Sequence, residues 1–175
     1  MPPPTTDLKT WAREVGDDTY LCTTDPEPID LAALKAALGS DLMWWANPVE
    51  DQVELKKMVD HSLCFSLYHV WKEGDRNHGR SPMVGFARVI TDYVTFAYLT
   101  DVYVLPEHQG KGLGVWMMEC LDKVLKQWPG LRRTMLMARD EHAKRMYERV
   151  LGMKRVTGAI MEGMGPGATA ALKEL

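Results

Sequence analysis

The sequence predicts a mixed α/β fold in which a mainly antiparallel sheet is flanked by helices. Residues 63–104 contain three runs of β-forming residues joined by polar links, a pattern typical of an antiparallel meander. In residues 113–128 apolar side chains recur at steps of three and four, as an amphipathic helix requires. Strand-like and helix-like segments alternate after that helix, so both kinds of element contribute to one fold.

Residues 1–18 are rich in proline and charge and are expected to form a loose lead-in. Residues 19–24 are rich in β-forming side chains and end before an Asp-Pro pair, which predicts a short strand. Asp30 is suited to cap a helix over residues 31–38, and Gly39 is suited to end it.

A second helix is predicted over residues 48–61, where apolar residues are spaced among charges. The meander follows as strands over residues 63–71, 83–90 and 93–104. The polar, glycine-containing residues 72–82 are expected to form the long tip of the first hairpin.

The rest of the chain continues with the helix over residues 113–128, which a Pro-Gly pair ends. A strand over residues 131–138, a helix over residues 140–150 and the start of a last strand over residues 152–156 are then expected. Residues 158–175 are a glycine-rich C-terminal tail.

The chain has 175 residues, the length of one ordinary domain, and we expect a single domain over residues 1–175. The formal net charge of −3 provides no field for phosphate backbones, so no nucleic-acid partner is expected. No apolar run reaches the roughly 18 residues of a membrane span, and no signal-peptide pattern is seen. The lack of such a run also predicts no membrane partner. Three widely spaced cysteines indicate a reduced, cytoplasmic setting.

One segment carries a chemical signal: the glycine-rich residues 106–114, at the start of the predicted helix. A helix N-terminus offers unpaired N–H groups and a positive partial charge, so it binds anions. Gly110, Gly112 and Gly114 would let the backbone approach phosphate oxygens closely, and Lys111 would add a positive charge. The alternative is a turn that only joins a strand to a helix.

The two standard nucleotide motifs do not fit this segment. A P-loop needs Ser or Thr after its Gly-Lys pair, and here Gly112 follows Lys111. A dinucleotide fingerprint needs a third glycine where this chain has Val115. A different phosphate ligand is therefore expected.

The pattern that fits is Q/R-x-x-G-x-G/A, with Gln109, Gly112 and Gly114. Here the chain resembles the GNAT superfamily of coenzyme A-dependent N-acetyltransferases. The resemblance extends over about residues 60–157 and includes a second signature at residues 143–153, with an alanine and a tyrosine before a glycine.

This second signature departs from the family's pattern at several positions. The family often has Asn where this chain has Asp140. Met146 stands where the family has Leu, and Met153 where it has Phe. The spacing between Tyr147 and Gly152 is one residue longer than in the family's pattern.

The resemblance implies acetyl-CoA as co-substrate and no metal. Its pyrophosphate would be held by the backbone amides of Gln109, Gly110, Lys111, Gly112, Leu113 and Gly114. The main chain of Val102, Tyr103 and Val104 would pair with the pantetheine arm as an added strand does. Asp140 and Tyr147 would also contact the cofactor. Parallel strands near residues 99–104 and 131–138 would splay into a wedge that admits it.

Acetyl transfer to an amine requires one proton to leave the amine and allows one to reach the leaving thiolate. Tyr147 stands where the family often has the general acid for the second step. Asp101 is the candidate general base. It could equally cap a strand or form an ion pair with an arginine. Asp92 and Glu107 are weaker candidates in expected turns.

The acceptor implied by the resemblance is a primary amine of a small molecule or peptide. Aromatic residues of the first half would line its pocket or belong to the core: Trp44, Trp45, Phe65, Tyr68 and Phe86. A non-catalytic module that binds or senses acyl-CoA stays open as the alternative function. A monomer and a homodimer both stay open.

Overall fold

The computed structural model describes residues 7–43, 47–72, 80–138 and 140–158, together with Ile160, Met161, Gly163 and Gly165. The strands are β1 (Thr10–Val15), β2 (Asp18–Thr23), β3 (Leu63–Val70), β4 (Met83–Thr91), β5 (Phe96–Val104) and β6 (Arg133–Leu136). The α-helices are α1 (Leu31–Leu38), α2 (Gln52–Asp60), α3 (Leu113–Leu125) and α4 (Glu141–Leu151), and two short 3-10 helices are η2 (Asp41–Met43) and η3 (Pro106–His108).

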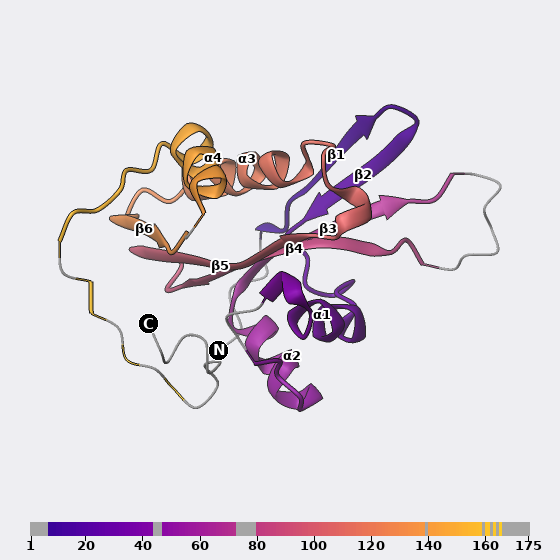
Figure 1. Ribbon diagram of the computed structural model, residues 1–175, viewed down its shortest axis with the longest axis horizontal. Coiled ribbons are helices and arrows are strands. Elements are labelled where there is room, and N and C mark those ends of the chain that lie inside the picture. Colours follow the sequence, from indigo (N-terminus) through magenta and orange to yellow (C-terminus); the bar gives the residue numbers. More distant parts are fainter. Residues whose placement is uncertain are drawn as a thin grey trace.

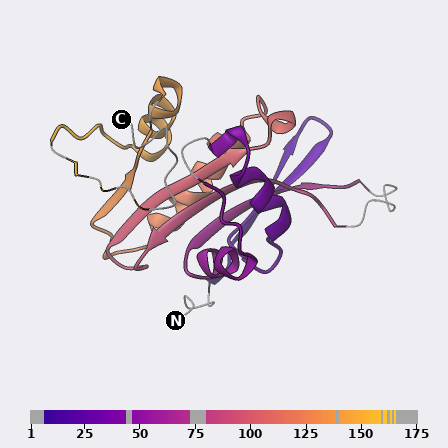
Figure 2. The same cartoon turned by 60° about the horizontal axis from the view of Figure 1, so that its bottom comes forward.

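The strands form one six-stranded sheet in chain order, β1 to β6. Neighbouring strands from β1 to β5 are antiparallel, and β5 and β6 are parallel. Helices α1 and α2 lie on one face of the sheet, and α3 and α4 lie on the other (Figures 1 and 2). The predicted fold class, a mixed and mostly antiparallel sheet flanked by helices, is confirmed. No helix among the described residues is both long and apolar enough to span a bilayer.

Helices α1 and α2 begin at aspartates that act as N-caps. The Asp30 carboxylate accepts the N–H groups of Ala32 and Ala33, each at 3.0 Å, and the helix ends at Gly39 as predicted. Asp51 caps α2 in the same way, so that helix is shorter than the predicted residues 48–61. Such a cap stabilises a helix by about 1 kcal/mol.

The expectation of a loose lead-in over residues 1–18 is wrong, because strand β1 lies within it. β1 pairs along its whole length with β2, which begins at Asp18. The ring of Trp11 stacks on Phe65 with the centroids 6.4 Å apart, so one face of β1 is anchored to the core. Residues 1–6 lie outside the described part of the chain.

The last strand expected over residues 152–156 is not formed, which makes β6 an edge of the sheet. Arg155 instead binds back to α4, with Nε 2.8 Å from Glu148 and a terminal nitrogen 2.9 Å from Glu141. These ion pairs keep the segment on the charged side of α4. In the tail 158–175, the residues that the structure describes are exposed.

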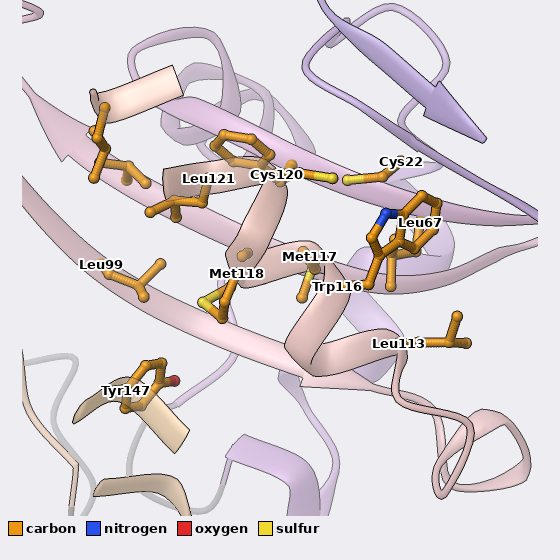
Figure 3. Packing of buried hydrophobic residues seen from close by; sticks show 14 of the residues in the cluster. Cys22, Leu67, Leu99, Leu113, Trp116, Met117, Met118, Cys120, Leu121 and Tyr147 are labelled. Atoms are coloured by element: carbon orange, nitrogen blue, oxygen red, sulfur yellow. The ribbon is translucent and has the colours of Figure 1, made fainter. Parts of the chain in front are cut away.

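The core has one cluster on each face of the sheet. The cluster under α3 and α4 includes Tyr20, Phe65 and Met117, each 0% exposed, and the other lies under α1 and α2 around Leu34 and Phe86. Each large apolar side chain buried in this way contributes about 1.5–3 kcal/mol. Figure 3 shows the first cluster, in which the sulfur atoms of Cys22 and Cys120 face each other. This packing fixes the position of α3, at whose N-terminus the glycine-rich loop ends.

Candidate active site

Strands β5 and β6 separate where the predicted wedge should open. Their parallel pairing runs from Phe96 opposite Arg133 to Leu99 opposite Leu136. β5 then continues to Val104 without a register partner on β6. The main chain of residues 100–104, which includes the predicted Val102, Tyr103 and Val104, therefore has a side that β6 does not cover.

A β-bulge lies at the start of this uncovered stretch. Thr100 is opposite Arg88, and Tyr103 is opposite Phe86, so two residues of β5 face one residue of β4. Asp101 has a φ of 52°, a left-handed conformation that is uncommon for a residue with a side chain. The bulge turns the chain as it approaches the glycine-rich loop.

Asp101 is paired with an arginine. The Arg88 Nε donates to Asp101 Oδ2 at 2.7 Å, and the two side chains are 14% and 12% exposed. A second guanidinium nitrogen of Arg88 donates to Ser62 Oγ at 3.3 Å. The sequence left two alternatives to a catalytic role for Asp101, and one of them, an ion pair with an arginine, is present.

The glycine-rich loop presents an open helix terminus. Gly110 and Gly112 have φ values of 77° and 73°, which glycine adopts at little cost. A Cβ on either would meet no described atom within 4 Å, and no side chain caps α3. The first amides of α3 are therefore available to an anion, as the glycine spacing predicted.

Gln109, the first residue of the signature, braces the loop. Its side-chain Nε2 donates to the Val104 carbonyl at 2.8 Å, and its backbone N–H donates to the Pro106 carbonyl at 3.2 Å. The loop is thereby tied to the end of β5. Leu113 is 1% exposed, so its side chain belongs to the core.

Tyr147 enters the core cluster from α4, beside β5 (Figure 3). It is 9% exposed, and this burial raises the pKa of its hydroxyl to about 12, with the charge of Asp140 adding to the effect. The hydroxyl therefore carries its proton at neutral pH.

Asp140 is the N-cap of α4. Its Oδ1 accepts the N–H of Ala143 at 2.8 Å, and the residue is exposed. Asp140 and Tyr147 are thus linked through one helix, whose first turn Asp140 stabilises.

Sequence reasoning missed a polar cluster beside the loop. The Lys111 ammonium does not extend alone into solvent but donates to Tyr20 Oη at 2.9 Å and Asp18 Oδ2 at 3.0 Å. Asp18 Oδ1 lies 3.0 Å from His69 Nε2, and Tyr20 Oη lies 3.0 Å from His108 Nδ1. No local motif signals this cluster, because its members come from β2, β3 and the loop, up to 93 residues apart in sequence.

The predicted aromatic residues separate into different places. Phe65 stacks on Trp11 in the cluster under α3 and α4. Tyr68 and Phe86 lie in the other cluster with Tyr103, and within the described part of the chain the buried Tyr68 hydroxyl has no hydrogen-bond partner. Trp44 and Trp45 lie outside the described residues.

Sequence comparisons with known proteins give consistent matches. The model of the Acetyltransferase (GNAT) family matches residues 39–153. A curated protein of Gibberella zeae, whose name describes an acetyltransferase, is 41% identical over 172 residues, which cover 89% of this chain and 93% of that protein.

Solved structures show the same arrangement. A protein of Xanthomonas campestris, described as belonging to the GNAT family, is 33% identical with a TM-score of 0.65, covering 85% of this chain and 94% of that one. A Clostridium acetobutylicum acetyltransferase structure with acetyl-CoA shares the fold, with 12% identity and a TM-score of 0.54 over 90% of this chain and 96% of that one.

Proposed function

Because the chain belongs to the GNAT family of acetyltransferases, we propose that it transfers an acetyl group from acetyl-CoA to a primary amine of a small molecule or peptide. The observation that carries the proposal is the uncapped N-terminus of α3, which opens beside the stretch of β5 that β6 leaves uncovered. The exposed amides at the start of α3, here called the anion cradle (residues 110–114), are suited to a diphosphate. The free edge of β5 is suited to an amide-rich arm, which can pair with it as a strand does.

The residues present fit acetyl-CoA. The positive φ values of Gly110 and Gly112 turn the loop so that a phosphate meets no Cβ. In the proposal the amides of residues 110–114 bind the pyrophosphate. The Gln109 amide, which the sequence also assigned to this set, already donates to the Pro106 carbonyl, and the Gln109 side chain keeps the loop on β5 through its bond to Val104. The main chain of Val102 to Val104 pairs with the pantetheine arm. The acetyl-CoA bound in the Clostridium acetobutylicum structure supports this choice of ligand.

When bound, acetyl-CoA supplies an acetyl group already activated as a thioester. A backbone N–H of the uncovered β5 stretch would polarise the thioester carbonyl by hydrogen bonding. Tyr147 is the proposed proton donor to the leaving sulfur. Its pKa, raised to about 12, keeps the hydroxyl protonated at neutral pH but also makes it a weaker acid than an ordinary tyrosine.

Asp101 is the proposed site for the proton that leaves the amine, directly or through water. Its carboxylate is already shared with Arg88, so accepting a proton there would weaken the ion pair. The same pair can hold Asp101 in place at the bulge. Asp101→Asn, which keeps the size and removes the basic oxygen, should lower kcat in a sample that urea unfolding shows to be folded, because the variant also leaves Arg88 without its ion-pair partner.

The experiment for the proposed function is a thiol-release assay with acetyl-CoA and a panel of polyamines, amino acids, aminosugars, arylalkylamines and peptides. Tyr147→Phe should lower kcat by about 10²-fold or more, while the Kd for CoA in calorimetry should stay within about 3-fold. Tyr93→Phe is a matched control, because burial also raises the pKa of Tyr93 to about 12 but its ring lies against Trp128.

Each result has a distinct meaning. Equal rates for Tyr147→Phe and the wild type would remove Tyr147 from the mechanism. CoA binding without turnover on any amine would favour the non-catalytic acyl-CoA module. No CoA binding at millimolar concentration would overturn the proposal itself.

A further inference from the structure

Five polar side chains meet beside the glycine-rich loop and form a continuous chain of contacts. Lys111 donates to Asp18 at 3.0 Å and to Tyr20 at 2.9 Å. Tyr20 Oη is in turn 3.0 Å from His108 Nδ1, and Asp18 is 3.0 Å from His69. Two of these residues, His108 and Lys111, belong to the connection between β5 and α3, which passes beside β2 (Figure 1).

The direction of the hydrogen bonds at Tyr20 follows from which of the neighbouring groups can donate a proton. The Lys111 ammonium has no lone pair, so Tyr20 Oη accepts from it and its own proton is directed at His108 Nδ1. That requires His108 to be neutral. Burial, His69 and Lys111 all lower the pKa of His108, which agrees with this arrangement.

The β2 side of the cluster is rigid. Tyr20 is 0% exposed, and β2 is hydrogen-bonded to β1 on one side and to β3 on the other.

The loop side is rich in glycine, which restricts its own backbone less than any other residue. Lys111 stands between Gly110 and Gly112, both in the left-handed region, and glycines lose more conformational freedom on ordering than other residues. Without a tether this loop would have to be ordered when a ligand binds, at the expense of affinity.

We propose that Asp18 and Tyr20 are positioning residues for the cofactor: acting through Lys111 and His108, they hold the loop of residues 108–112 in the conformation that binds the pyrophosphate. The inference rests on the proposed use of acetyl-CoA. In this proposal the Lys111 ammonium binds Asp18 and Tyr20 and does not bind the pyrophosphate. Backbone amides alone bind the pyrophosphate, and Lys111 supports the loop that carries them.

The test compares Asp18→Asn, Tyr20→Phe, Lys111→Met and the double variant Asp18→Asn/Lys111→Met. Each single variant should raise the Kd for CoA and the KM for acetyl-CoA by roughly tenfold, with kcat at saturation within about twofold. The double variant should bind no more weakly than Lys111→Met, because both changes cut the same tether. Lys111→Arg, which can still reach Asp18, should restore most of the affinity.

Two controls separate positioning from a loss of structure. Lys56 and Asp60 form an exposed ion pair on α2, at 2.7 Å, so Lys56→Met and Asp60→Asn should leave CoA binding unchanged. S-acetylpantetheine lacks the phosphates, so its kcat/KM should be the same in wild type and in the tether variants. A general unfolding would lower both activities together and would count against the inference.

Other outcomes overturn the inference without touching the proposed function. If Lys111→Met weakens CoA binding while Asp18→Asn and Tyr20→Phe do not, Lys111 binds a phosphate itself and the tether is dispensable. If none of the variants changes the Kd, the cluster has no role in the loop. If the wild type itself does not bind CoA, the failure lies with the proposed function.

Discussion

Among single residues, Asp101 is both the proposed general base and one half of a buried ion pair with Arg88 that stabilises the fold. Their charges are 2.7 Å apart and largely removed from water. Removing one partner leaves the other charge buried and uncompensated, which costs far more than the pair contributes when intact.

We expect Arg88→Met to lower the free energy of unfolding by about 3–5 kcal/mol. Urea unfolding followed by fluorescence measures the loss. The double variant Arg88→Met/Asp101→Asn should recover much of it, because no unpaired charge remains and Asn tolerates the left-handed conformation of residue 101. An unchanged midpoint for Arg88→Met would show that water reaches Asp101 and replaces the guanidinium.

Gly112 offers a second test at this scale. With φ at 73°, Gly112→Ala should cost about 1–2 kcal/mol of stability, although its Cβ has open space. Gly114→Ala is the matched control: among the described residues a Cβ there meets only Val104 Cγ2, at 4.0 Å, and alanine favours the helix. Equal melting temperatures for the two variants would contradict the strained conformation at Gly112.

At the scale of elements, α4 is held at its start by one side chain. Asp140→Ala should destabilise the protein by about 1 kcal/mol, whereas Asp140→Asn, which can still accept the Ala143 N–H, should be nearly neutral. Thermal unfolding compares the two. A loss of CoA affinity in Asp140→Asn without loss of stability would instead support the predicted cofactor contact.

Elements with local signals could be predicted from the sequence. Helix α1 has its cap at Asp30 and its end at Gly39, and both signals are adjacent to the helix they delimit. The glycine-rich turn into α3 could be predicted too, because Gly110 and Gly112 lie within one short segment whose conformation depends on the glycines themselves.

Elements set by tertiary contacts could not be predicted in this way. β1 is stabilised by pairing with β2 and by Trp11 on Phe65, and residues 152–156 are drawn to α4 by Arg155. The strand predicted from residue 93 begins at Phe96, because the Asp92 carboxylate accepts the N–H groups of residues 94–96 and closes a turn. The cluster around Lys111 likewise joins segments that are distant in sequence.

At the scale of the whole molecule, buried tyrosines couple stability to alkaline pH. Burial raises the pKa of Tyr93 and Tyr147 to about 12, and it raises the pKa of Tyr68 and Tyr103 as well. A group whose pKa is raised by folding stabilises the protein below its unfolded pKa, which is about 10 for tyrosine, and loses that contribution as the pH rises through the folded value.

We therefore expect the urea midpoint to be constant up to about pH 10 and to fall steeply towards pH 12. The tyrosinate absorbance of these four residues should appear together with unfolding. Ionisation of the four near pH 10 in the folded protein would show that their hydroxyls are not buried.

Because the three cysteines are buried, their reaction with a thiol reagent reports when parts of the fold separate. Cys22 and Cys120 are 0% exposed and Cys64 is 3% exposed, so a thiol-labelling reagent can reach them only when part of the molecule comes apart. Cys22 and Cys120 belong to the cluster under α3, whereas Cys64 belongs to the cluster under α2. The order in which mass spectrometry finds them labelled would thus tell which of the two layers detaches from the sheet first.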